Sequence, residues 1–321
     1  MDLTPKRIYE ELGNSKINKF RAYDILISLI ENSESEEIRI SAIKYLEKIE
    51  VNPEHLFNLL ENLLISDSNS EIRNRAAKFL KNSFLEKSFN TFKWVIKHET
   101  DYECLIIAIR SLEEINSNES KLILINEIKK ITRIKILNKE RKTENKKFKK
   151  VIKKFIKTKK LINFTHTELG EILINYLTIF NLINQYPNVY YELDPQNGLI
   201  RELDLSDYME YEVKGTPFGW KNNIQSIKEI IGLKYLKKLK KIDLSNNLIT
   251  DAKDLLNLKE LTHLILRNNK IIEKENLNYF KRLSNLEFLD LRGNELAKKI
   301  KLNEFDPKIN VLLTDSHISI N

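Results

Sequence analysis

The chain has 321 residues, of which 41% are hydrophobic and 31% are charged, with a formal net charge of +8. The single cysteine, Cys104, excludes an internal disulfide framework and a cysteine-rich metal site. The first residues lack the apolar stretch of a secretory signal, and no apolar run is long enough to cross a bilayer. We therefore expect a cytoplasmic protein with no transmembrane segment.

Glycine and proline divide the chain into two parts. Residues 54–169 contain neither, which favours long helices joined by short polar loops. From Pro187 onwards both recur, so a chain rich in turns begins there. We expect a multi-domain protein with a helical array over 1–130, a basic helical junction over 131–187, and a turn-rich domain over 188–321.

Three stretches of ten residues share one pattern in the first region. Each begins with Glu and has Ala sixth, a basic residue eighth and Leu tenth; they are Glu37–Leu46, Glu71–Leu80 and Glu103–Leu112. An amphipathic stretch precedes each of them, so a pair of helices recurs about every 34 residues. One such pair cannot bury its apolar face alone, and successive pairs are therefore expected to stack.

The helix pairs resemble HEAT repeats, in which an acidic turn residue precedes an Ile–Arg pair at the start of the second helix. Ile38-Arg39 and Ile72-Arg73 match that pair, and Asp67 lies in the turn, whereas the third copy has Cys104-Leu105 instead. The resemblance covers about residues 16–130 and implies an all-α superhelical array. In it, Arg39, Arg73 and Asp67 are expected to hold neighbouring pairs together.

The excess positive charge belongs to one segment. Residues 129–160 carry sixteen lysines or arginines against two glutamates, and residues 145–162 are sharply amphipathic at helical spacing. The apolar arc consists of Phe148, Val151, Ile152, Phe155, Ile156 and Ile162. The opposite arc consists of Lys149, Lys150, Lys153, Lys154, Lys157 and Lys160.

Three interpretations of this basic helix are open. It is a terminal cap with solvated lysines, a phosphate-binding surface for nucleic acid, or a surface for an anionic membrane. Burial of the apolar arc would remove the membrane interpretation. Next along the chain, the capping box Thr165-His166-Thr167-Glu168 predicts a second, largely apolar helix over 167–184.

The pattern LxxLxLxxNxL occurs three times in the last region, at spacings of 22 and 25 residues. The copies are Leu239–Ile249, Leu261–Ile271 and Leu286–Leu296. This pattern resembles leucine-rich repeats, which implies a short α/β solenoid of parallel strands. We expect Asn247, Asn269 and Asn294 to bond the turn backbone and to stack as a ladder.

The ends of this array have their own signals. Val189–Leu193 and Leu199–Leu205 flank an Asn-Gly turn, which predicts a β-hairpin over the first edge. A partial copy at Ile200–Leu205 lacks the asparagine, and Tyr208–Asn223 is expected to be a loop insertion. Val311–Thr314 is expected to form a degenerate last strand.

Side chains that alternate with the buried leucines should face outward on the concave side of the array. They include Phe, Ile, His and Arg residues among aspartates, which is typical of interface anchors. The candidate protein-binding residues are Lys241, Asp243, His263, Ile265, Arg267, Phe288, Asp290 and Arg292. The alternative is an inert, solvated face.

No pattern in the sequence indicates catalysis. The chain has no phosphate-binding glycine loop and no HExxH, and its five histidines lack metal-ligand spacing. We interpret Cys104 as a small core residue and His98–Asp101 as a solvated turn. The sequence therefore predicts a non-enzymatic adaptor without metal or cofactor, which binds a protein through the leucine-rich face and the helical array. The alternative is binding to nucleic acid or an anionic surface through the basic helix.

Overall fold

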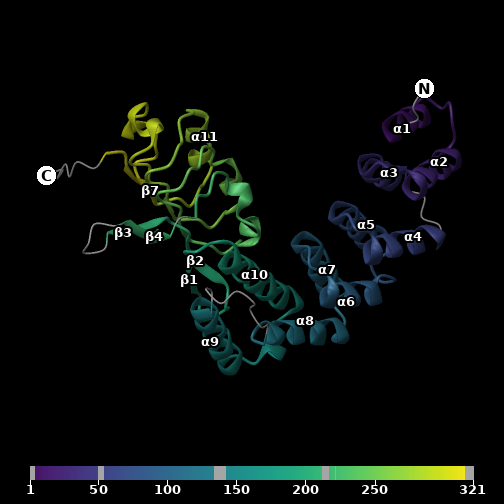
Figure 1. Cartoon of the computed structure of the whole chain (residues 1–321), viewed down its shortest axis with the longest axis horizontal. Coiled ribbons are helices and arrows are strands. Elements are labelled where there is room, and N and C mark those ends of the chain that lie inside the picture. Colours follow the sequence, from purple (N-terminus) through teal and green to yellow (C-terminus); the bar gives the residue numbers. More distant parts are fainter. Residues whose placement is uncertain (1–3, 50–53, 134–141, 212–216, 221, 315–321) are drawn as a thin grey trace. The chain divides into compact units, whose positions relative to one another are not determined.

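The computed structural model describes residues 4–49, 54–133, 142–211, 217–220 and 222–314 (Figure 1). For residues 142–145, 208–211 and 217–220 it describes the backbone alone. The chain forms two compact units. Unit 1 comprises Met1–Ile125 and Thr165–Gly170, and unit 2 comprises Asn126–Phe164 and Glu171–Asn321.

Helices precede the first strand of the described chain. They are α1 (Pro5–Gly13), α2 (Lys19–Asn32), α3 (Glu36–Ile49), α4 (Glu54–Ser66), α5 (Ser70–Ser83), α6 (Phe89–His98), α7 (Tyr102–Ile115), α8 (Asn118–Ile131), α9 (Lys142–Thr158) and α10 (His166–Gln185). Polar residues start several of them, since Asn18, Asn69 and Asp101 each accept a backbone N–H of the first turn.

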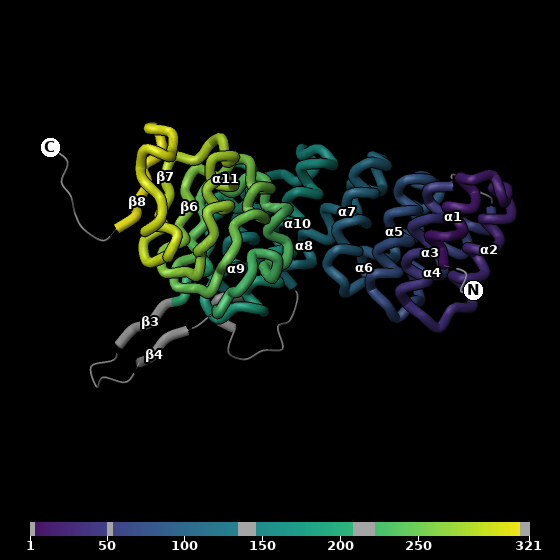
Figure 2. Tube along the Cα trace, turned by 90° about the horizontal axis from the view of Figure 1, so that it is seen from above, coloured from purple at the N-terminus to yellow at the C-terminus, as the bar shows by residue number. Residues whose placement is uncertain are grey.

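Unit 1 is a stack of helix pairs, as the ten-residue pattern predicts. Helix α2 packs on α3, α4 on α5 and α6 on α7, while α3, α5 and α7 pack on one another in that order (Figures 1 and 2). The recurring alanines Ala42, Ala76 and Ala108 are all 0% exposed. A methyl group at this position lets the next helix approach closely, and this explains why the pattern has alanine there.

Arginine–carboxylate pairs join consecutive helix pairs. Arg39 forms an ion pair with Asp67, as expected, and also donates to the carbonyl of Ile30. Arg73 donates to both carboxylate oxygens of Glu99, at 2.7 and 3.0 Å. The contact between the second and third pairs is therefore made although the third copy lacks the Ile–Arg signature.

The interpretation of His98–Asp101 as a solvated turn is wrong for two of its residues. The Glu99 side chain is only 6% exposed because it faces Arg73. Asp101 accepts the Cys104 N–H at 2.9 Å and a proton of the Asn74 amide at 3.1 Å. The prediction that Cys104 is a core residue is confirmed, since it is 0% exposed and its burial raises the pKa of the thiol.

Unit 2 contains a six-stranded mixed sheet in the order β1-β2-β5-β6-β7-β8. Strand β1 pairs with β2 antiparallel, which confirms the predicted hairpin, and each later pair is parallel. The strands are β1 (Tyr190–Leu193), β2 (Ile200–Asp204), β5 (Lys241–Asp243), β6 (His263–Ile265), β7 (Phe288–Asp290) and β8 (Asn310–Leu312). The predicted last strand is therefore present as β8.

Short helical turns connect the parallel strands. The turns and the strands lie on opposite sides of the buried leucines. They are η3 (Ile227–Glu229), η4 (Leu233–Tyr235), η5 (Lys253–Asn257), α11 (Glu275–Lys281), η6 (Glu295–Lys298) and η7 (Leu302–Glu304). Figure 2 shows the chain between β6 and β8 winding through successive turns. The core between strands and turns is made of leucines and isoleucines that are almost fully buried, such as Leu244, Leu266 and Leu291.

The predicted asparagine ladder is confirmed. The Asn269 amide donates to the carbonyls of Leu244 and Leu266, at 2.9 and 3.0 Å, and its oxygen accepts the Ile249 N–H at 3.0 Å. Asn247 and Asn294 make the corresponding bonds one copy earlier and one copy later. Each asparagine thus satisfies turn backbone groups in its own copy and in the preceding one.

The first copy also has its asparagine, contrary to expectation. Asn222 donates to the Leu205 carbonyl at 2.8 Å, although the two residues are 17 apart, whereas Asn294 lies 3 residues from its own Leu291. Ile224 then follows as the next apolar residue and is 0% exposed. An insertion displaces this asparagine along the sequence but not in space.

The insertion is not simply a loop, since β3 (Tyr208–Tyr211) pairs antiparallel with β4 (Pro217–Trp220). Residues 212–216 and 221 lie outside the described residues.

The basic helix and its successor pack in unit 2, apart from the first turn of α10. Helix α9 ends at Thr158 rather than at 162, and the short η2 (Leu161–Asn163) follows it. The capping box of α10 is present, with Thr165 and Glu168 exchanging hydrogen bonds. From α10, the Asn175 amide oxygen accepts the Ile200 N–H at 3.0 Å, which fixes the helix to β2.

Candidate functional site

The candidate site is the outward surface of the parallel strands, called here the sheet face. It consists of the outward-facing side chains of β2, β5, β6 and β7 and of the second residue after each of these strands. The eight residues predicted from the sequence all lie here. Six of them are in cross-strand register, and Arg267 and Arg292 follow the ends of β6 and β7. Lys241 is opposite His263, which is opposite Phe288; Asp243 is opposite Ile265, which is opposite Asp290.

Stacked rings lie at the centre of the first row. The His263 and Phe288 rings have centroids 5.7 Å apart and are inclined by 22°. Both side chains are partly exposed, as is Ile265 on the next row. An aromatic pair with an adjacent isoleucine, held by the strands beneath, provides rigid apolar area for a partner.

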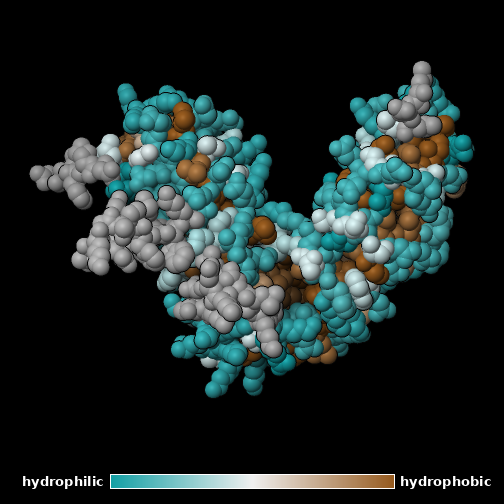
Figure 3. Space-filling view, in the orientation of Figure 1, coloured by the Kyte–Doolittle hydropathy of each residue, from teal (hydrophilic) through white to brown (hydrophobic). Residues whose placement is uncertain are grey.

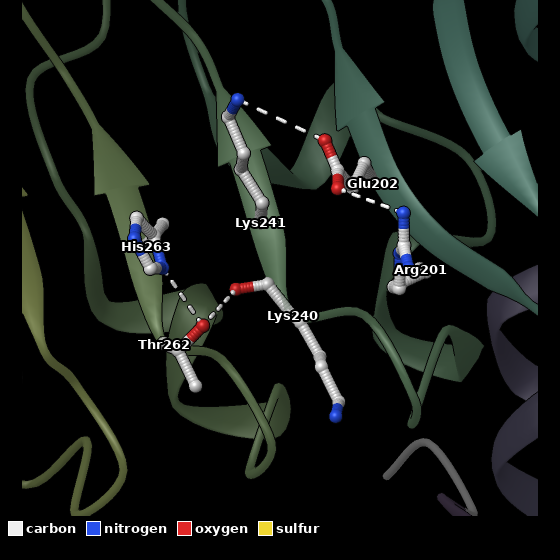
Figure 4. Close-up of a pocket in the computed structure, with 6 residues that line it drawn as sticks. All are labelled: Arg201, Glu202, Lys240, Lys241, Thr262 and His263. Atoms are coloured by element: carbon white, nitrogen blue, oxygen red, sulfur yellow. Dashed lines mark hydrogen bonds and ion pairs between the residues drawn. The ribbon is translucent and has the colours of Figure 1, made fainter. Parts of the chain in front are cut away.

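A basic hollow of about 440 Å³ lies beside these rings, at the start of β2, β5 and β6. It is lined by Arg201, Glu202, Lys240, Lys241, Thr262 and His263 (Figure 4). Glu202 bridges Arg201 at 3.3 Å and Lys241 at 3.7 Å, whereas the Lys240 side chain points away from this network. The lining has three cationic side chains and one carboxylate, and Arg201 also pairs with Glu192 at 2.8 Å. A small excess of positive charge remains, which favours an acidic group on a ligand.

Aspartates end three of the strands and are held by their own turns. Asp204, Asp243 and Asp290 each accept the backbone N–H of the residue two positions later, at 2.8 to 3.1 Å. Burial raises the pKa of Asp243, the Ser245 hydrogen bonds oppose that shift, and the charge of Asp204 adds to it. This row therefore contains three acids that are partly or fully removed from water, with Ile265 between two of them.

The structure changes the expected role of Asp290. The residue is 2% exposed, and its carboxylate accepts hydrogen bonds from the Arg292 guanidinium at 2.6 to 3.1 Å. Asp290 therefore orients Arg292 and has almost no surface of its own for a partner. Arg267 lies one strand earlier and is partly exposed, as Arg292 is.

The basic helix has the lysine face that the sequence predicts. Lys150, Lys153, Lys154, Lys157 and Lys160 are exposed, while Lys149 is half-buried. In the apolar arc, Phe148 and Ile152 are 0% exposed and Phe155 is 6% exposed. Phe148 packs edge-on against Tyr176 and Tyr191. This burial removes most of the apolar surface that the membrane interpretation requires, although Val151 and Ile162 remain exposed.

Sequence reasoning missed Arg201 and Lys240 as site residues. Alternation along a strand indicates which side chains face outward, and it assigns Arg201 and Lys240 to the opposite side. Both residues nevertheless line the hollow. The run of lysines before β5 is a signal that could have found Lys240, whereas no such run precedes β2 and marks Arg201.

No protein-family profile, curated protein or solved structure matches the chain. No helix of the described residues has the length and apolar character needed to cross a bilayer.

Proposed function

We propose that the chain is a non-enzymatic scaffold that binds another protein through the sheet face. The observation that carries the proposal is the cluster of His263, Ile265 and Phe288, partly exposed and flanked by the basic hollow. Interfaces of this kind combine an apolar, aromatic centre with charged residues at the rim. In the visible orientation, polar residues cover most of the strand-containing part, and the exposed apolar patches among them are small (Figure 3).

The repeated architecture supports the same class of function. The stacked helix pairs and the strand copies with their asparagine ladder favour HEAT-like and leucine-rich repeats, both of which serve mainly as protein-binding surfaces. We place the protein in the cytoplasm, where its lone buried thiol needs no disulfide partner. A phosphate-binding role for the α9 lysines is the second candidate, because at least five of them face solvent.

The sheet face can be tested by removing its apolar centre. We expect the double variant Ile265→Ser and Phe288→Ser to recover at least tenfold less of its protein partner from native lysate, since central anchors contribute about 2 kcal/mol or more each. Quantitative mass spectrometry of affinity-purified complexes measures the recovery. Arg292 is left in place because its removal would strand the buried Asp290 charge.

The matched control removes exposed apolar side chains outside the strands. Ile272 is 43% exposed and Leu302 is 56% exposed. The double variant Ile272→Ser and Leu302→Ser should recover the partner within about twofold of the unchanged chain. Equal recovery by both double variants would count against the sheet face.

A further inference from the structure

A groove of about 800 Å³ runs between helix α9 and strand β1, in unit 2. One wall is formed by α9, through Lys147, Lys150, Val151 and Lys154, and the other by the chain from Pro187 to Leu193. The groove is not part of the sheet face. A ligand that binds in the groove is therefore independent of the proposed function.

The β1 wall is the edge of the sheet. Strand β1 is at the end of the strand order and pairs only with β2 among the described strands. Every second residue of such a strand directs its N–H and C=O away from its partner, and these groups can pair with an added strand. Strand β1 has four residues, and the N–H and C=O of Asn188 before it are already bonded to the Asn222 side chain. The edge can therefore hold an extended segment of about four residues.

The α9 wall is basic. Lys147, Lys150 and Lys154 are exposed and recur at helical spacing, so they lie on one side of the helix. They form no ion pair with any other side chain that the structure describes. Val151 lies among them and is 40% exposed, which provides an apolar contact in the groove.

The groove's carboxylate is already compensated. Glu192 accepts the Arg201 guanidinium at 2.8 Å and the Tyr190 hydroxyl at 2.6 Å, and these bonds lower its pKa. The groove therefore presents an excess of positive charge along one wall and unpaired strand backbone along the other. We propose that it binds an extended acidic segment of a partner protein, which joins the sheet as a further strand beside β1.

The two walls together favour a polypeptide over a nucleic acid. A phosphate backbone binds to cationic side chains, but it has no alternating N–H and C=O groups that could pair with the edge of a strand. An extended peptide satisfies that edge, and its alternate side chains project towards one wall. Acidic residues at every second position would then meet the lysines, while the intervening residues cover the sheet.

The test uses the full chain and a fluorescein-labelled peptide of eight residues with alternating glutamate and valine. We expect micromolar binding that weakens as salt rises. The variant Lys150→Glu with Lys154→Glu should raise the Kd at least tenfold. The matched control, Lys153→Glu with Lys157→Glu, makes the same charge change at the same spacing on the same helix, outside the groove lining. It should change the Kd less than threefold.

Two further probes separate strand addition from charge attraction. The same peptide, N-methylated at alternate residues in either register, keeps its charge but loses the strand donors of one edge, and at least one register should bind at least tenfold more weakly. A 20-nucleotide single-stranded DNA should bind more weakly than the peptide. The proposal is overturned by absence of peptide binding at millimolar concentration, by equal losses in the two charge variants, by undiminished binding of both N-methylated peptides, or by tighter binding of the DNA. Circular dichroism checks that both variants retain the fold.

Discussion

Replacing Arg73 with methionine should destabilise unit 1 by about 3–5 kcal/mol, the largest effect we expect from a single substitution. The Glu99 side chain is 6% exposed, and each of its two carboxylate oxygens accepts a hydrogen bond from the Arg73 guanidinium. Without them the charge remains buried, and breaking one side of such a pair costs far more than the pair contributes. Hydrogen exchange of the α5 and α7 amides, followed by mass spectrometry, measures the loss.

Arg75 provides the matched control. It lies two residues along α5, is 34% exposed at the side chain, and pairs with Glu71 one helical turn away. Because exposed pairs of this spacing contribute about 0.3–0.5 kcal/mol, Arg75→Met should leave exchange in α5 and α7 nearly unchanged. If the two variants exchange alike, Arg73 does not join the helix pairs as described.

The same pair has a definite pH dependence. Burial disfavours the Glu99 carboxylate, but the Arg73 hydrogen bond and two backbone N–H groups outweigh it and hold the pKa below the ordinary 4.5. The stabilisation from this group is therefore present above pH 4.5 and is lost as the pH falls through the lowered pKa. In Arg73→Met, burial without the guanidinium should raise that pKa. The difference in the free energy of unfolding between the unchanged chain and the variant should consequently become smaller as the pH falls from 7 to 4.

Replacing Asn269 with leucine should destabilise unit 2 by about 2–3 kcal/mol. The leucine has a similar volume but cannot accept the Ile249 N–H, which then stays buried without its partner. An unsatisfied buried group costs about 1–3 kcal/mol, and the Leu244 and Leu266 carbonyls each also lose one donor. The denaturation midpoint of unit 2, followed by hydrogen exchange of β5 and β6, reports the change.

An asparagine outside the ladder serves as its control. Asn278 is exposed on α11, so Asn278→Leu should change stability by less than about 0.5 kcal/mol. A midpoint for Asn269→Leu equal to that of Asn278→Leu would contradict the role assigned to the ladder.

Local periodicity was enough to predict much of the fold. The helix pairs, the hairpin, the capping box and the ladder all depend on residues close together in sequence, where spacing determines which side chains share a face. The first ladder asparagine, Asn222, escaped this reasoning because an insertion separates it from Leu205. Glu99 was missed because its partner lies a helix pair away, and no local pattern connects a turn carboxylate with Arg73.

The candidate site was predictable to a smaller extent. Strand alternation indicated the outward side chains, but only coordinates show that Asp290 is buried under Arg292. The groove beside β1 depends on how α9 packs against the sheet edge. That packing is determined by Phe148, Tyr176 and Tyr191, which come from three separate elements.

Docking of a protein on the sheet face can be tested in the cell. The most direct measurement places a photo-crosslinking amino acid at Phe288 in one version of the full chain and at Lys298, exposed on η6, in another. Irradiation in the native cell should join a discrete protein partner to position 288 and not to position 298. Crosslinking at position 298 alone, or at neither position while the chain is folded, would contradict the account.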